Sequence, residues 1–214
     1  MDRDIILTQG TRILMPTEYN ALKRAMLTQE QRERIKQYID DGNLQKANRT
    51  QRYPIICDML LQTGMRLVEA RAMHRDWYRA PRRVVVIPKG ACKKVRCTFS
   101  ERTVMLSLPG CDAVDRYLQS GVSIPATSNT FRDALIVFAK RADIGTAGIT
   151  PKMFRKTLVS WLMACYPERE MYISASMGHD RYTLQKHYLG VLGGVPRMEV
   201  ELMREYLKDW GMRL

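Results

Sequence analysis

The run T-P-K-M-F-R-K-T, residues 150–157, decides how the second half of this sequence folds. Thr150 followed by Pro151 is a typical helix start, with the threonine as N-cap and the proline as the first helical residue. Lys152 and Arg155 lie three positions apart, so both side chains project from one face near that helix end. A helix N-terminus attracts anions through its unpaired N–H groups and its dipole. The run therefore predicts an anion site, although an isolated pair at this spacing is more often a solvated basic face.

A second run, M-G-H at residues 177–179, and the later Tyr188 lie downstream. Gly178 predicts a break in the chain, and His179 begins the next predicted helix. Tyr188 follows His179 by nine positions, which is about two and a half helical turns. The two side chains can therefore border one cleft without touching each other. Taken singly, a histidine after glycine is more often a cap, and a helical tyrosine is more often part of the core.

Far upstream, the run T-G-M-R-L-V-E at residues 63–69 supplies another arginine, Arg66. Gly64 predicts a tight break, from which the guanidinium of Arg66 can reach into a cleft. A planar guanidinium binds two phosphate oxygens at once, so arginine suits an anion site. Glu69 comes three residues later and can hold Arg66 in place. The alternative is a surface ion pair of little energetic value.

The whole pattern predicts a mainly α-helical chain with a small antiparallel β-hairpin. Residues 1–16 are expected to form a short N-terminal arm, and residues 17–214 a single domain, because no linker rich in proline or serine divides the chain. A capping box at Thr28 and Gln31 starts the second helix. The other predicted helices cover residues 17–27, 43–62, 67–73, 111–120, 129–142, 151–165, 168–176, 180–190 and 197–210.

The predicted hairpin is the most basic local segment. Residues 82–87 are rich in β-branched side chains, and Pro88-Lys89-Gly90 is a turn signal. The chain returns with alternating apolar residues between Val95 and Leu106. The basic side chains in the middle of the hairpin are Lys89, Lys93, Lys94 and Arg96.

The C-terminal segment, residues 195–214, is predicted to contain an amphipathic helix with Val200, Met203 and Leu207 on its apolar face. That face can pack on a neighbouring protomer or on its own domain, and the pattern favours neither.

Composition narrows the class of protein. The chain has 214 residues, a net charge of +13 and a pI of about 9.8. A domain this basic attracts polyanions, most commonly DNA or RNA. An anionic membrane surface is the alternative partner, but the basic residues are not gathered in one amphipathic helix, as such binding would favour. No run approaches the roughly 18 apolar residues of a membrane span, and the N-terminus lacks the apolar region of a signal peptide. The five cysteines form no C-x-x-C pair, which fits reduced thiols in a cytoplasmic protein.

The ordered set of motifs resembles the tyrosine recombinase (phage integrase) family. That family carries T-G-x-R-x-x-E, a β-hairpin lysine, H-x-x-R, L-G-H and a downstream tyrosine, and this sequence follows the same order across residues 55–190. Any one of these motifs is weak evidence, whereas five in order form a strong signal. Lys152 stands where many members have histidine. The resulting K-x-x-R is similar to a variant in some integrases of archaeal viruses and plasmids.

The resemblance implies the catalytic-domain fold of that family and DNA cleavage and rejoining without a metal or another cofactor. Tyr188 would attack the scissile phosphate and form a 3′-phosphotyrosyl link. Arg66 and Arg155 would bind the non-bridging oxygens, and His179 would donate a hydrogen bond to the phosphate.

The lysines have supporting roles in this scheme. Lys89 would protonate the 5′-hydroxyl leaving group, with Lys93 and Lys94 as competitors on the same hairpin. Lys152 would add positive charge. The further DNA contacts expected are Lys93, Lys94, Arg96 and Lys156.

The implied partners are double-stranded DNA and further copies of the chain on that DNA, from dimer to tetramer. Integrases commonly carry an N-terminal core-binding domain that completes a clamp around DNA, and residues 1–50 leave little room for one. Two alternatives stay open: a topoisomerase-like enzyme that nicks and rejoins DNA, and a basic DNA-binding regulator without catalysis.

Overall fold

The computed structural model describes residues 6–8, 10–91, 101–178 and 195–211. The tip of the predicted hairpin and the predicted helix over residues 180–190 fall outside these ranges. The predicted site residues outside the described residues are Lys93, Lys94, Arg96, His179 and Tyr188.

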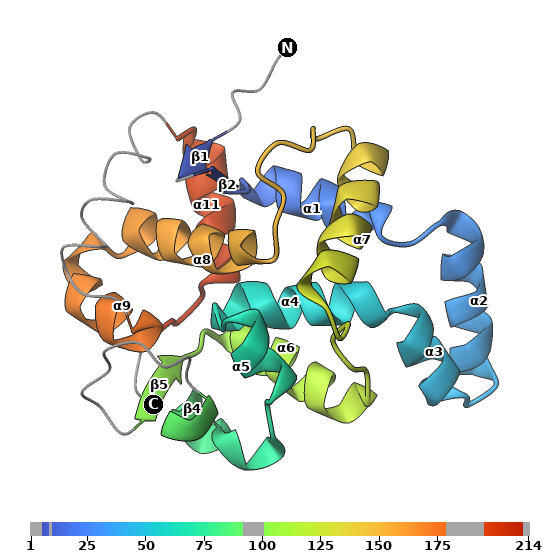
Figure 1. The fold of residues 1–214 in the computed structure, drawn as a ribbon, viewed down its shortest axis with the longest axis horizontal. Coiled ribbons are helices and arrows are strands. Elements are labelled where there is room, and N and C mark those ends of the chain that lie inside the picture. The colour runs from blue at the N-terminus through green and yellow to red at the C-terminus, as the bar shows by residue number, and fades with distance from the viewer. Residues whose placement is uncertain (1–5, 9, 92–100, 179–194, 212–214) are drawn as a thin grey trace.

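Helices dominate the described chain, as the sequence pattern predicts (Figure 1). The helices of the N-terminal half are α1 (Pro16–Ala25), α2 (Gln29–Asp40), α3 (Leu44–Thr50), α4 (Arg52–Thr63) and α5 (Leu67–Arg71). Those of the C-terminal half are α6 (Leu108–Ser120), α7 (Ser128–Arg141), α8 (Lys152–Cys165), α9 (Glu170–Met177) and α11 (Arg197–Tyr206).

The predicted antiparallel hairpin is confirmed as strands β4 (Val84–Pro88) and β5 (Glu101–Met105), with Val85 opposite Val104. A third strand, β3 (Tyr78–Arg79), pairs antiparallel with β4 and completes a three-stranded sheet. Two residues are too few for an alternation of apolar and polar side chains, so the sequence did not predict β3. A separate two-stranded pair joins β1 (Leu7–Thr8) to β2 (Thr11–Arg12).

Several helix ends agree with the sequence signals, and others differ by one to four residues. Thr28 and Gln31 form the predicted capping box of α2. The predicted stretch 43–62 is divided at Gln51 into α3 and α4. The predicted cap at Thr150 is wrong: α8 starts one residue later, at Lys152, and the Thr150 hydroxyl caps nothing in the described chain. The main-chain carbonyl of Thr150 closes the first turn instead, because it accepts from the Met153 N–H at 3.0 Å.

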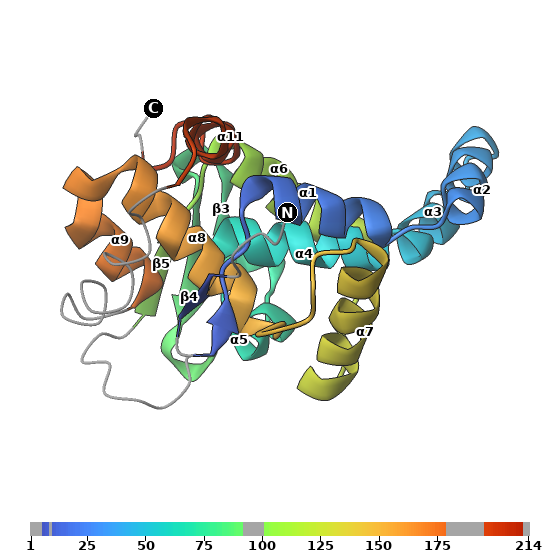
Figure 2. The same ribbon diagram turned by 90° about the horizontal axis from the view of Figure 1, so that it is seen from above.

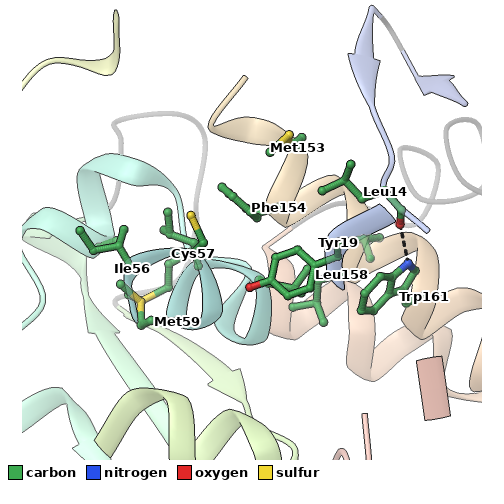
Figure 3. Packing of buried hydrophobic residues seen from close by; sticks show 14 of the residues in the cluster. Leu14, Tyr19, Ile56, Cys57, Met59, Met153, Phe154, Leu158 and Trp161 are labelled. Atoms are coloured by element: carbon green, nitrogen blue, oxygen red, sulfur yellow. Dashed lines mark hydrogen bonds between the residues drawn. The ribbon is translucent and has the colours of Figure 1, made fainter. Parts of the chain in front are cut away.

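The core is built mainly by α4 and α8, whose apolar faces meet near the middle of the molecule (Figure 3). The segment that follows β2 lies along α8, and its Leu14 is fully buried. The Leu14 N–H donates to Thr157 Oγ1 at 3.0 Å, and Trp161 Nε1 donates to the Leu14 carbonyl at 2.9 Å. These bonds hold the segment after β2 against buried residues of α8, the helix that carries Lys152 and Arg155.

The elements around α4 lie on two sides of it (Figure 2). In that view α6 lies on one side of α4, and α5 and α7 lie on the other, while the α2–α3 pair extends away from the rest of the chain. Among the described residues, no helix is long and apolar enough to cross a membrane.

Helix α11 packs on its own domain, against α8 and α1. Met203, Leu207 and Trp210 are buried in this contact. Trp210 Nε1 donates to the Met105 carbonyl at 3.0 Å, and Arg169 Nη1 donates to the Trp210 carbonyl at 2.7 Å. The end of the described chain is therefore held next to β5 and α9.

Candidate active site

The first part of the site is the break between α4 and α5. Gly64 ends α4 in the left-handed conformation, with φ 57°. A Cβ at this position would lie 2.9 Å from both Leu158 Cδ2 and Met177 Sδ, so the backbone approaches α8 and α9 more closely than a side chain permits. The tight break predicted at Gly64 is confirmed, and it places Arg66 at the N-cap of α5.

Glu69 holds Arg66 at two points. Its carboxylate accepts from the Arg66 main-chain N–H at 2.8 Å and from Arg66 Nη1 at 2.9 Å. The Glu69 side chain is fully buried, whereas that of Arg66 is 38% exposed. The pair is therefore not a surface ion pair. The buried carboxylate fixes a guanidinium that is still accessible from outside.

Arg155 joins the same break to the end of α9. Its side chain is buried, and its Nη1 donates to the Gly64 carbonyl at 2.8 Å. Its Nη2 donates to the Met177 carbonyl. These two carbonyls belong to the C-terminal ends of α4 and α9, where the helix dipoles favour a cation. Arg155 thus ties together the chain positions that precede Arg66 and His179.

Arg102, on β5, is a site residue that the sequence reading missed. Its Nη2 donates to Glu69, and its Nη1 donates to the Ser176 carbonyl at 2.8 Å. The residue is buried although it carries a charge. The signal for it was weak: Arg102 shares the inward side of β5 with buried Val104, and a charged residue at an inward position needs a partner.

Lys152 and Lys156 occupy the start of α8. Lys152 is exposed, and Lys156 is half-buried. Burial lowers the pKa of Lys156, and repulsion from Lys152 lowers it further. Each effect disfavours the charged ammonium. Lys152 and Lys156 lie four positions apart, so both side chains project from one side of the helix start.

Lys89 is exposed, in the short 3₁₀ turn Lys89–Ala91 after β4. Within the described ranges, no hydrogen bond or ion pair joins Lys89 to Arg66, Glu69 or Arg155. The structure therefore brings Arg66, Glu69 and Arg155 together with Arg102 and does not connect Lys89 to them. No group of three or more His, Cys, Asp or Glu side chains within the described ranges could hold a metal ion.

The charges of this cluster suit an anion. Two guanidinium groups, those of Arg66 and Arg102, bind the Glu69 carboxylate, and that of Arg155 binds the Gly64 carbonyl two residues before Arg66. Glu69 compensates one positive charge, and Lys152 and Lys156 add two more at the start of α8. Guanidinium groups bind phosphate oxygens in a fixed geometry, so the accessible edge of Arg66 can bind a phosphate.

This chain is similar to known proteins in its fold but not in its sequence. No protein-family model matches the sequence, and no curated protein sequence is significantly similar to it. Similar folds do occur among solved structures. The XerA recombinase superposes with a TM-score of 0.53 at 15% identity, covering 90% of this chain and 64% of that chain.

Two further matches were solved with DNA. A Tn1549 transposon integrase fragment in complex with circular intermediate DNA gives a TM-score of 0.53 at 15% identity, covering 84% of this chain and 66% of that chain. The XerH site-specific recombinase bound to a palindromic difH substrate gives a TM-score of 0.53 at 14% identity, covering 94% of this chain and 51% of that chain. The present chain thus spans between about half and two thirds of the lengths of these three proteins. Its fold, mostly helical with a small antiparallel sheet, is that of tyrosine recombinase catalytic domains.

Proposed function

We propose that this chain is the catalytic part of a site-specific DNA recombinase or integrase. The observation that carries the proposal is the joining of Arg66, Arg155 and the Met177–Gly178 turn by one set of hydrogen bonds, in a fold shared with tyrosine recombinases. Two sequence motifs more than 80 residues apart thereby meet at one place, since Arg155 and Gly64 are separated by 91 positions. A chance basic surface would not explain this meeting.

The proposed chemistry uses the residues of this cluster together with the motif residues Tyr188 and Lys89. Tyr188 attacks the scissile phosphorus with its phenolic oxygen, and the bond to the 5′ oxygen breaks. The phenol loses its proton, and the 5′ oxygen receives one from Lys89. Arg66 and Arg155 stabilise the negative charge that builds on the non-bridging oxygens. The phosphotyrosyl link preserves the energy of the phosphodiester, so the same site can rejoin the strand.

The main-chain bonds of Arg155 are compatible with this role. A guanidinium has five N–H donors, and the carbonyls of Gly64 and Met177 take two of them. Binding these carbonyls fixes the plane of the group before DNA arrives. A group fixed in advance costs no reorganisation when charge develops on the phosphate.

The finer features of the proposal come from the motifs. His179 hydrogen-bonds the phosphate, and Lys152 supplies charge where many recombinases have histidine. The K-x-x-R pair is a reason to place the chain near integrases of archaeal viruses and plasmids, which insert viral or plasmid DNA into a genome. The partner is double-stranded DNA in the cytoplasm. Exchange between two duplexes requires several copies of the chain.

A covalent capture experiment tests the proposal. The protein is mixed with nicked duplexes whose sequence is randomised around the nick, so that a short 5′-hydroxyl fragment is lost after cleavage and the protein stays attached to DNA. We expect wild type and the control Tyr182→Phe to capture one enriched sequence, and Tyr188→Phe to capture none. Equal capture by Tyr188→Phe contradicts the assignment of the nucleophile.

The same experiment separates the alternatives. Capture without sequence enrichment, together with relaxation of supercoiled plasmid, supports the topoisomerase-like function instead. Retention of DNA by wild type without any covalent adduct supports the regulator instead. Either result overturns the proposed recombinase.

A further inference from the structure

We propose that Arg102 is a positioning residue of this site, which sets the geometry of Arg66 through Glu69 and that of the chain leading to His179 through α9. The proposal rests on the proposed function. Arg102 does not belong to any motif that identified the site, and it lies on β5 instead of a helix. Its role follows from its contacts.

The first contact of Arg102 is with Glu69. The carboxylate of Glu69 accepts from Arg66 on one side and from Arg102 Nη2 on the other. Glu69 is fully buried and the Arg102 side chain is 7% exposed, so the two opposite charges compensate each other inside the protein. The orientation of the Glu69 carboxylate, and with it the position of Arg66, is therefore fixed from β5.

The second contact is with the end of α9. Arg102 Nη1 donates to the Ser176 carbonyl at 2.8 Å. Gly178 has φ 60°, and a Cβ at this position would lie 2.7 Å from Arg102 Cδ. The aliphatic part of Arg102 therefore lies against the residue that precedes His179. The Arg102 side chain thus holds this turn in two ways. Its guanidinium binds the Ser176 carbonyl, and its aliphatic part sets how closely the backbone at Gly178 can approach β5.

The contacts of Arg102 and Arg155 close a ring. Arg155 links the Gly64 carbonyl to the Met177 carbonyl, and Arg102 links Ser176 to Glu69. Glu69 returns to Arg66, two residues after Gly64. Every member of the ring is held by two others, so loss of one link leaves the Arg66 loop and the α9 end joined on one side only.

Only arginine fits this position in the ring. Its planar group carries separate donors on Nη1 and Nη2, which here reach two different acceptors. Lysine keeps the positive charge beside Glu69 but ends in a single nitrogen and cannot reproduce this fork. Arg102→Lys therefore removes the link to Ser176 or the link to Glu69 while leaving the net charge unchanged.

The test compares Arg102→Lys with Arg197→Lys. Arg197 also pairs with a glutamate, Glu201, but its side chain is 94% exposed. For each variant we measure the single-turnover rate of covalent adduct formation at saturating DNA, the Kd for the same DNA and the unfolding midpoint. A misplacement of about 1 Å can lower a rate about 100-fold. We expect a loss of this order in the cleavage rate of Arg102→Lys, with Kd changed less than about threefold, since net charge sets most of the affinity for DNA.

Several results would overturn the inference. One is a cleavage rate of Arg102→Lys equal to that of wild type, and another is an equally large loss of rate in Arg197→Lys. A third is a loss of rate in Arg102→Lys that is fully explained by weaker DNA binding. If Arg102→Lys does not fold, the comparison moves to Glu69→Gln and the double variant Glu69→Gln/Arg102→Gln, in which two amides replace the buried charges. We expect the rate losses of Glu69→Gln and Arg102→Gln to be strongly non-additive in the double variant. Additive losses contradict an action through Glu69.

Failure of the inference differs from failure of the proposed function. If wild type forms no covalent adduct with any DNA, the proposed function fails. If wild type forms the adduct and Arg102→Lys forms it equally fast, the inference alone fails.

Discussion

The starts of α5 and α11 carry the same local pattern with opposite consequences. At α5, Glu69 pairs with Arg66 three residues earlier; at α11, Glu201 pairs with Arg197 four residues earlier. The Glu201 side chain is 59% exposed, whereas Glu69 is fully buried and binds a second arginine. Spacing along a helix therefore predicts an ion pair. Burial and a third partner decide how much that pair contributes to the free energy of unfolding.

Removal of each glutamate gives the largest expected difference. Glu69→Ala leaves the buried Arg102 without its charge partner, so we expect a loss of about 3–5 kcal/mol in the free energy of unfolding. Glu201→Ala removes an exposed pair, and we expect a loss of about 0.5 kcal/mol. Urea denaturation of both variants measures the two values. Equal losses would show that the buried network contributes no more than a surface pair.

Two glycines extend the comparison to the backbone. Gly64 and Gly121 both end helices in the left-handed conformation, with φ 57° and 66°. A Cβ at Gly121 meets nothing within 4 Å, whereas one at Gly64 contacts Leu158 and Met177 at 2.9 Å. We expect Gly121→Ala to cost about 1 kcal/mol and Gly64→Ala about 3 kcal/mol, because overpacking adds to the strained φ. Urea denaturation of both variants measures the two losses in the free energy of unfolding. A smaller loss for Gly64→Ala than for Gly121→Ala would mean that Leu158 and Met177 move aside easily.

The smallest expected effect concerns Lys156 and pH. Burial and Lys152 lower the pKa of Lys156, so the charged form disfavours folding. This penalty is full below the lowered pKa and falls to zero as the pH rises to the ordinary pKa of lysine. A bound phosphate favours the charged form, so DNA binding should take up a proton and weaken as the pH rises through the lowered pKa. Lys156→Arg does not titrate in this range. The DNA affinity of Lys156→Arg, measured by fluorescence titration, should therefore fall less steeply with pH than that of wild type. If the two proteins lose affinity with pH in parallel, Lys156 does not contact the DNA.

The local motifs explain how much of the site could be predicted. Arg66 and Glu69 lie within one turn of each other, so spacing alone indicated their pairing. Gly64 was readable as a break because a left-handed residue at a helix end is usually glycine. In each case, the interacting residues are neighbours in the sequence.

Arg102 could not be predicted in this way because its partners are distant in the sequence. Glu69 lies 33 residues before it, and Ser176 lies 74 residues after it. Strand alternation indicates only that its side chain points inward. The burial of Glu69 was missed for the same reason, since it involves the contact with Arg102 of β5. The assignment of Thr150 as a cap failed because a main-chain carbonyl closed the first turn of α8 instead.

The predicted mainly helical fold is confirmed, because long helices have strong periodic signals and short loops fix their order. The sheet was harder to predict than the helices. Its central strand, β4, has a run of β-branched residues, whereas β3 depends on pairing with a neighbour. Sequence periodicity does not report such pairing.

The central claim is that this chain cleaves DNA through Tyr188. Its most direct test is mass spectrometry of the captured protein–DNA adduct after digestion of both components. The account predicts a nucleotide attached by a 3′-phosphodiester to the peptide that contains Tyr188, and no attachment elsewhere. A nucleotide on another residue, or a sample without any adduct under conditions where the protein binds the same DNA, would contradict it.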